Sequence, residues 1–127
     1  MQIKTFEELV ISRREWIDTV LIPWCRTASR RDLLLAEHEW TDLAGRPDPE
    51  ITLWRWAWQR FLHLVHPVHH SLDETQCITV YCTDGRKIRG YPEARMSQAG
   101  LLFLVTEGGQ TVGPINLDDI ATVEIAA

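Results

Sequence analysis

Short β-type runs recur along residues 76–126, and each run ends at turn-forming residues. In the first run, residues 78–83, apolar and polar side chains alternate with the period of two that a half-buried strand requires. Glycine, proline and aspartate mark the turns between the runs. The pattern predicts strands at residues 78–83, 87–90, 101–106, 111–115 and 122–125, with one helical turn at residues 117–120. We therefore expect a five-stranded antiparallel sheet that curls into a small closed barrel.

The N-terminal part of the chain has the period of helices instead. Thr5 followed by Glu8 has the spacing of a capping box, which satisfies two backbone amides at a helix start. The apolar residues that follow fall largely on one helix face. They are Phe6, Leu9, Val10, Trp16, Ile17, Val20 and Leu21. Because the residue before a proline disfavours the α conformation, we expect this helix to end before Pro23, with Ile22 extended.

Two further helices are predicted between Ser29 and His66. The first has Ser29 as its N-cap and ends at Gly45, a residue that suits the left-handed position after a helix. The second restarts at Pro49, behind Asp48 as its N-cap, and runs to about His66. The N-terminal region is therefore expected to contain three helices.

The third predicted helix is apolar around most of its circumference, which leaves a narrow polar seam. The seam consists of Arg55, Gln59, His63 and His66. Such a helix needs neighbours on several sides, so we interpret Trp54 and Trp58 as the core that joins the helices to the barrel. The alternative is an exposed tryptophan shelf on which bases or a peptide stack.

The two patterns divide the chain into a helical region, residues 1–75, and a small β-barrel, residues 76–127. The predicted class is α+β, with three N-terminal helices packed on the barrel in one shared core. A one-turn connection before the last of five short strands is the order found in Sm-like and SH3-like barrels. Within that group the barrel resembles the Rof family of small Rho-inhibitor antiterminators, through Asp84-Gly85, Leu102–Glu107 and Leu117–Ile120. The resemblance implies a regulatory module that acts on a protein partner in transcription or RNA metabolism.

Composition places the chain among ordinary globular proteins, because 45% of its residues are hydrophobic and 24% are charged. Its three cysteines lack the spacing of a disulfide framework, which favours a reducing compartment. With no signal peptide and no apolar stretch long enough for a membrane span, we expect a cytoplasmic protein without a membrane partner. The net charge of −5 disfavours a grip on a nucleic-acid backbone and suits a basic protein partner.

A histidine-rich stretch is the main candidate for metal chemistry. Six potential ligands lie close together in the sequence: His63, His66, His69, His70, Cys77 and Cys82. Zinc accepts such ligands, so a metal-binding protein or enzyme is one alternative. Pro67 interrupts the spacing, however, and the two cysteines lie on opposite faces of a strand unless a bulge intervenes. Since no nucleophile motif or converging carboxylate pair accompanies them, we expect no cofactor and no catalytic activity.

The leading hypothesis is a non-enzymatic module that binds a protein partner through exposed acids of the barrel. These acids are Glu107, Asp118 and Asp119. The alternative is direct RNA binding by a basic and aromatic group: Tyr81, Arg86, Lys87, Arg89 and Tyr91. The wide apolar surface of the third helix and the barrel edges also predict a homodimer or a larger homo-oligomer.

Overall fold

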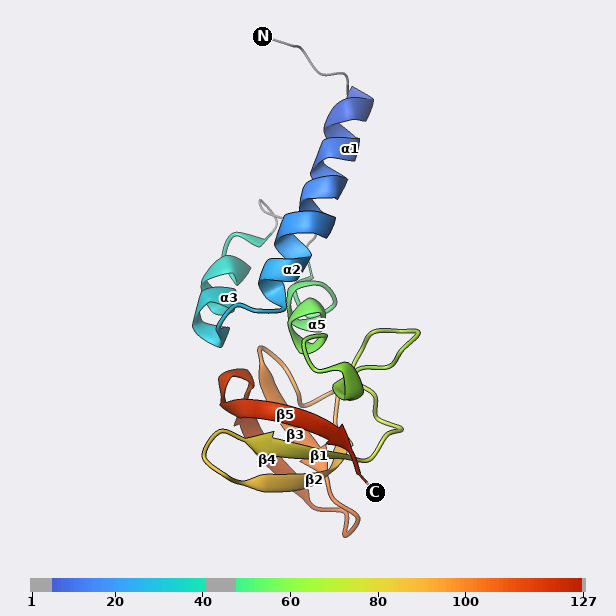
Figure 1. Cartoon of the computed structure of the whole chain (residues 1–127), viewed down its shortest axis with the longest axis vertical. Helices are drawn as coiled ribbons and strands as arrows, with labels where there is room; N and C mark the ends of the chain where they lie inside the picture. The colour runs from blue at the N-terminus through green and yellow to red at the C-terminus, as the bar shows by residue number, and fades with distance from the viewer. Residues whose placement is uncertain (1–5, 41–47, 127) are drawn as a thin grey trace.

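The computed structural model describes residues 6–40 and 48–126 (Figure 1). The class is α+β, with the helices at one end, a five-stranded antiparallel sheet at the other, and α1 pointing away from the sheet. The helical elements are α1 (Phe6–Trp16), a π-helical segment (Ile17–Leu21), α2 (Ile22–Cys25), α3 (Arg30–Glu37), α5 (Leu53–Trp58) and two 3₁₀ turns (Leu62–Leu64 and Leu117–Asp119). The strands are β1 (Ile78–Cys82), β2 (Lys87–Pro92), β3 (Leu101–Val105), β4 (Thr111–Asn116) and β5 (Ile120–Ile125).

The five predicted strands are confirmed, and their ends differ from the prediction by at most two residues. The strand order is β4-β3-β2-β1-β5. β2 serves both halves of the sheet, because its first part pairs with β1 while Tyr91 and Pro92 pair with β3. Gly90 stands at this change of partner, where a Cβ atom would lie 2.7 Å from the carbonyl oxygen of Val105. Only glycine fits so close an approach of two backbones.

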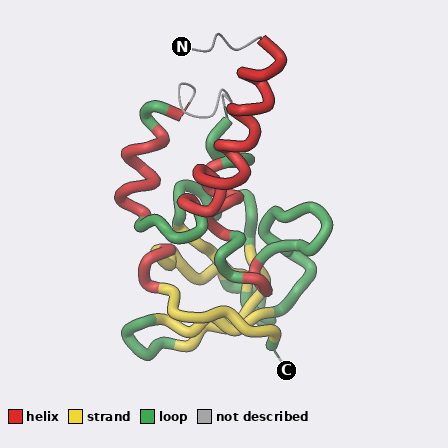
Figure 2. Tube along the Cα trace, turned by 45° about the horizontal axis from the view of Figure 1, so that its top comes forward, coloured by secondary structure: helices red, strands yellow, loops and turns green. Residues whose placement is uncertain are grey.

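The sheet is open rather than closed into a barrel, and its strands form the yellow part of Figure 2. β4 and β5 stand at the two ends of the strand order, and no pairing joins them in the part of the chain that the structure describes. The predicted closure is therefore wrong. Two features oppose it: Pro114 removes a ladder donor from β4, and the turn Leu62–Leu64 lies beside β5.

The N-terminal helix continues through Pro23 instead of ending before it. Ile22 has helical φ and ψ angles of −62° and −49°, so the prediction of an extended residue is wrong. The π-helical segment explains the difference, because the amide of Ile22 donates to the carbonyl of Ile17, five residues back. This wider turn makes room for the proline ring, which clashes with the preceding turn of a regular α-helix. The predicted N-cap Thr5 lies outside the described residues.

α3 begins where the sequence predicts. The Ser29 hydroxyl accepts a hydrogen bond from the amide of Asp32 at 3.2 Å, which is the geometry of an N-cap. The helix ends at Glu37, earlier than predicted, and the proposed C-cap Gly45 lies outside the described residues.

α5 is much shorter than the predicted helix. Asp48 caps the turn before it by accepting a hydrogen bond from the amide of Glu50 at 3.0 Å. Beyond Trp58 the chain leaves the helical path, and Phe61 has an extended backbone with φ −109° and ψ 97°. Val65 then forms a β-bridge with Leu72 and is buried. The prediction of helix to His66 is wrong because tertiary packing outweighed the local apolar period.

Trp54 and Trp58 join the helices to the sheet, as predicted. They are 0% and 3% exposed, which excludes a stacking shelf at these positions. Trp54 lies against Gly100 at the start of β3, and one hydrophobic cluster contains buried residues from both ends of the molecule. Arg60 strengthens the helical end, because its guanidinium donates to the carbonyls of Cys25 and Ala28 at 2.8 Å each.

Candidate binding surfaces

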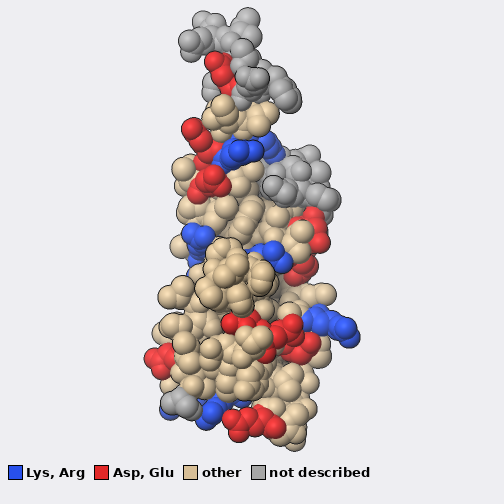
Figure 3. All heavy atoms as spheres, turned by 90° about the vertical axis from the view of Figure 1, so that its right-hand side faces the viewer, with Lys and Arg blue, Asp and Glu red and all other residues tan. Residues whose placement is uncertain are grey.

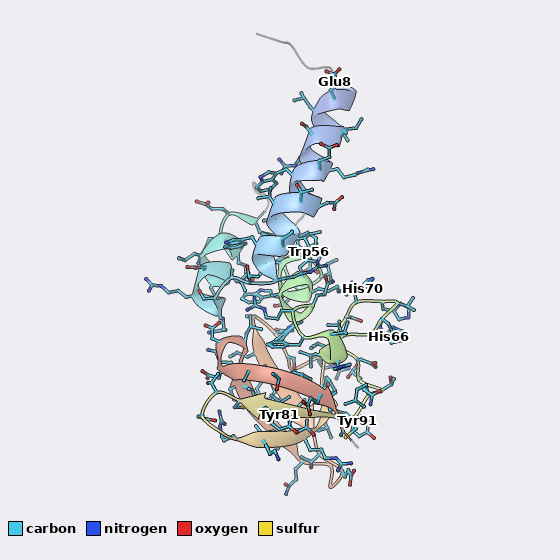
Figure 4. All side chains as sticks on the ribbon, viewed as in Figure 1. Glu8, Trp56, His66, His70, Tyr81 and Tyr91 are labelled. Carbon is cyan, nitrogen blue, oxygen red and sulfur yellow. The ribbon has the colours of Figure 1, made fainter. Side chains whose placement is uncertain are left out.

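The strand register brings four of the predicted RNA-binding residues onto one face of the sheet. Tyr81 of β1 lies opposite Lys87 of β2, whose ammonium is 5.4 Å from the centroid of the tyrosine ring. Arg89 and Tyr91 follow Lys87 at intervals of two residues, so they share its face. Figure 4 shows Tyr81 and Tyr91 on the sheet at the end of the molecule remote from α1. We call Tyr81, Lys87, Arg89 and Tyr91 the tyrosine face.

Neighbouring carboxylates weaken the positive charge around the tyrosine face. Arg86 lies in the β1–β2 turn and pairs with Asp84, with 2.7 Å between Nε and Oδ2. The backbone amide and the guanidinium of Arg86 lower the pKa of Asp84, so this carboxylate stays charged. Arg89 pairs with Glu107 at 3.3 Å. Both ion pairs are exposed, and they leave little net charge for a phosphate backbone.

The three acids predicted to bind a partner lie at two different ends of the sheet. Asp118 is close to the start of β3, because its neighbour Leu117 donates a backbone hydrogen bond to Gly100. Glu107 follows the other end of β3, about 17 Å away at the rise of a five-residue strand. Asp118 is also engaged within the fold, since its carboxylate accepts a hydrogen bond from the amide of Arg30 at 2.9 Å. Glu107, Asp118 and Asp119 therefore do not form one surface.

The predicted metal ligands do not converge. His66 and His69 stack with ring centroids 4.7 Å apart, and the Nδ1 atom of His66 accepts hydrogen bonds from the amides of Val68 and His69. His63 and His70 are exposed, and His70 has a left-handed φ of 61° at the end of this loop (Figure 4). Within residues 6–40 and 48–126 no three His, Cys, Asp or Glu side chains are arranged to hold a metal ion.

The histidine loop borders a groove of about 480 Å³ beside the end of β5. The lining is mostly apolar and includes Leu62 and Ile125, which are 77% and 53% exposed. Asp73 contributes a charge, since hydrogen bonds from Thr75 lower the pKa of its carboxyl group. The sequence analysis missed this groove because its walls come from segments more than fifty residues apart.

Two of the three cysteines, Cys25 and Cys82, have buried thiols with a raised pKa. Cys25 is fully buried, and burial raises its pKa to about 12 despite the nearby charge of Arg60. Cys82 is buried on the core side of β1, and burial raises its pKa as well. Cys77 is half-buried at the other side of the strand start, so no thiol pair forms. Cys25 and Cys82 pack as small apolar groups, since a nucleophilic thiol needs a lowered pKa.

Much of the apolar surface of the N-terminal helix is exposed. Its apolar residues were predicted to fall largely on one face, and from Glu8 onward, where side chains are described, the segment up to Leu21 packs on the core through Ile17 and Leu21. Leu9, Trp16 and Val20 are 53%, 39% and 50% exposed. The spacing of the apolar residues predicts an apolar helix face, but nothing in the local sequence predicts that this face is exposed to solvent. No helix in the described part of the chain is long and apolar enough to cross a membrane.

Comparison with protein-family models, with curated proteins and with solved structures finds no match for this chain. The evidence for function therefore lies in the surfaces of the molecule itself.

Proposed function

We propose that the protein is a non-enzymatic interaction module that binds a protein partner through the exposed apolar face of its N-terminal helix. The observation that carries the proposal is the run of Leu9, Trp16 and Val20 along one side of α1 and the π-helical segment. Spacings of seven and four residues place these side chains on one helix face.

The exposed face continues the surface that forms the core. Ile17 and Leu21 pack against the body, and the apolar stripe extends past them along the part of α1 that projects from the molecule (Figure 1). With Val10 and Trp24, which are 43% and 37% exposed, the stripe forms a patch on the order of 400 Å². Patches of this size on a soluble monomer are often functional.

The partner that fits this face is a protein that presents an apolar helix of its own. Helix-to-helix docking buries side chains one or two turns apart, which includes the spacings of seven and four residues in the stripe. The opposite side of the helix carries Glu15 and Asp18 and favours solvent. Charged groups of both signs are scattered over the face of the molecule in Figure 3, whereas the docking stripe is apolar.

The sheet supports an Sm-like or SH3-like assignment of the body, in an open form. The support for this part of the proposal is the 3₁₀ turn Leu117–Asp119 before the last of five antiparallel strands. In this proposal the body is a regulatory scaffold, and the partner belongs to the transcription or RNA machinery, as the resemblance to the Rof family implies.

Variants of the helix face test the proposal. Leu9→Gln combined with Val20→Gln removes two exposed apolar contacts without changing charge, whereas Ile11→Gln alters an equally exposed residue on the opposite side of α1. In affinity capture with quantitative mass spectrometry, the wild type and the control should retain the same protein, and the double variant should lose at least about nine-tenths of it. Equal retention by all three proteins contradicts the proposal. Circular dichroism confirms that the helix persists in each variant.

RNA binding by the tyrosine face is a second candidate, because one exposed surface presents two tyrosines beside two cations. Fluorescence anisotropy with a single-stranded oligouridine tests it. If RNA binds there, Lys87→Gln with Arg89→Gln should weaken affinity about tenfold, whereas Arg31→Gln on α3 should not. Affinity of the wild type should also fall as salt rises. Binding that is absent near physiological salt, or insensitive to the double variant, rejects this function.

A further inference from the structure

Arg55 is a half-buried arginine whose guanidinium has no acceptor among the described residues. Arg30 and Arg60 have comparable burial, and both donate to backbone carbonyls: Arg30 to Ala99 at 2.7 Å, Arg60 to Cys25 and Ala28. In the described part of the chain, Arg55 makes no hydrogen bond or ion pair. A guanidinium offers five donors in a planar fork, and those of Arg55 are not used within the described residues. They are free to bind an acceptor from outside the chain.

Arg55 lines a cavity of about 240 Å³ between α5 and the segment that joins β2 to β3. Arg95 of that segment lines the same cavity and also lacks a partner among the described residues. Trp58 and Leu72 provide apolar wall, and Ser71 provides a hydroxyl. The cavity therefore combines two free guanidinium groups with an apolar surface.

The carboxylates near the cavity accept hydrogen bonds from backbone amides, and within the described residues none of them forms an ion pair with Arg55 or Arg95. Glu50 accepts from the amide of Ala99 at 3.0 Å, and Glu93 accepts from the amide of Met96 at 2.8 Å. Glu74 accepts from the amide of Ala94 at 3.4 Å. Amides of the β2–β3 segment thus bind these three carboxylates, and both arginines keep unused donors.

We propose that this cavity binds a carboxylate attached to a small apolar group. A guanidinium fork matches the two oxygens of a carboxylate, and Trp58 and Leu72 suit the apolar part of the ligand. Glu50 in the wall disfavours a dianion such as phosphate. The volume is below the roughly 300 Å³ at which drug-sized pockets begin, so the ligand is a small organic acid or the C-terminal residue of a peptide.

Isothermal titration with defined probes tests the site and separates the two sources of the carboxylate. The probes are phenylacetate, the tripeptide Gly-Gly-Phe with a free C-terminus, the same tripeptide as an amide, and inorganic phosphate. We expect saturable binding of phenylacetate, of the free tripeptide, or of both, and none of the amide. Binding of phenylacetate alone identifies a small acid as the ligand, and binding of the tripeptide identifies a peptide C-terminus.

Two arginine variants and one control connect that binding to the cavity. Arg55→Gln should weaken binding about tenfold or more, because it removes a charged hydrogen-bond donor. Arg95→Gln should weaken it in the same direction and lies at an exposed position, so it remains informative if Arg55→Gln does not fold. Arg31→Gln, an exposed arginine on α3, should leave affinity within about twofold.

Three results would overturn the inference: no saturable binding of any carboxylate probe, phosphate binding as tightly as phenylacetate, or affinity unchanged by both arginine variants. These results do not test the exposed apolar face of the N-terminal helix, so the proposed protein interaction is tested separately.

Discussion

Gly100 stands directly before β3 with a left-handed φ of +76°. A Cβ atom there would lie 2.8 Å from Cζ3 of the buried Trp54. Gly85 has a similar φ of +94° in the β1–β2 turn, but a Cβ atom there meets nothing within 4 Å. The two glycines therefore separate the cost of the backbone conformation from the cost of a clash with the core.

Gly85→Ala should lower the free energy of unfolding by about 1 kcal/mol, which is the penalty of a left-handed residue with a side chain. Gly100→Ala should lower it by about 3 kcal/mol, because overpacking against Trp54 adds to the same penalty. Urea denaturation of both variants measures the difference. Equal losses would mean that the contact between Gly100 and Trp54 does not constrain the junction of helices and sheet.

Cys25 makes stability depend on pH in the alkaline range. Burial raises the pKa of its thiol from 9.0 to about 12 in the folded protein, so above pH 9 the unfolded chain releases this proton first. The free energy of unfolding should fall by about 1.4 kcal/mol per pH unit through this residue, a loss that is absent below the unfolded pKa. Cys25→Ala should show a shallower decline than the wild type in urea denaturation between about pH 9 and about pH 11. If the free energy of unfolding fell equally with pH in the wild type and in Cys25→Ala, Cys25 would not cause the decline.

At the scale of the elements, the start of α3 is held by two side chains. Ser29 caps the amide of Asp32, and Asp118 accepts from the amide of Arg30. The second contact connects the turn before β5 to the helical end, so it couples the two ends of the molecule. A carboxylate near a helix N-terminus is also favoured by the helix dipole.

Asp118→Ala should lower the free energy of unfolding by about 1 kcal/mol, as the loss of a cap does. Asp119→Ala, an equal change of charge at the next exposed residue, should change it by less than about 0.5 kcal/mol. Chemical denaturation of the two variants shows whether Asp118 stabilises the fold or is only an exposed surface residue. If Asp118→Ala left the free energy of unfolding unchanged, Asp118 would not stabilise the start of α3 and would be an exposed surface acid like Asp119.

At the scale of the whole molecule, the apolar helix face is expected to pair with itself when no partner protein is present. A two-fold arrangement places the same patch on both sides of the contact, and two patches on the order of 400 Å² each approach the size of a small specific interface. Light scattering should report about twice the chain mass of 14.7 kDa. Leu9→Gln with Val20→Gln should restore a monomer, and Ile11→Gln should remain dimeric. A wild-type monomer at all concentrations would contradict this prediction.

The sheet could be predicted from the sequence because its signals are local. Alternation in β1 and the turn at Asp84-Gly85 determine which side chains of β1 and β2 share a face, and four of the five residues proposed to bind RNA lie on one face, whereas Arg86 lies in the turn. Sheet closure was not foreseeable in the same way, because it depends on whether β4 and β5 meet after every other strand has bent and paired.

The helices and the candidate sites show the limit of local signals. Leu64 and Val65 have the period of a continuing helix, yet burial beside the sheet places them in a turn and a bridge. The cavity at Arg55 brings together Glu50, Ser71 and Arg95 from three separate segments, so no motif announces it. Sites of this kind depend on distances between segments, which a spacing along the chain does not contain.

By itself, the sequence determined the α+β class, the number and positions of the strands, the N-cap at Ser29, and the burial of Trp54 and Trp58. Each of these follows from side-chain period, capping or turn chemistry within a few residues. Only the tertiary structure decided that the sheet stays open, that the helix passes Pro23, that Leu9 and Val20 are exposed, and that Arg55 lines a cavity without an acceptor among the described residues. These outcomes depend on which segments compete for the same buried space, and that competition is settled only when the whole chain has packed.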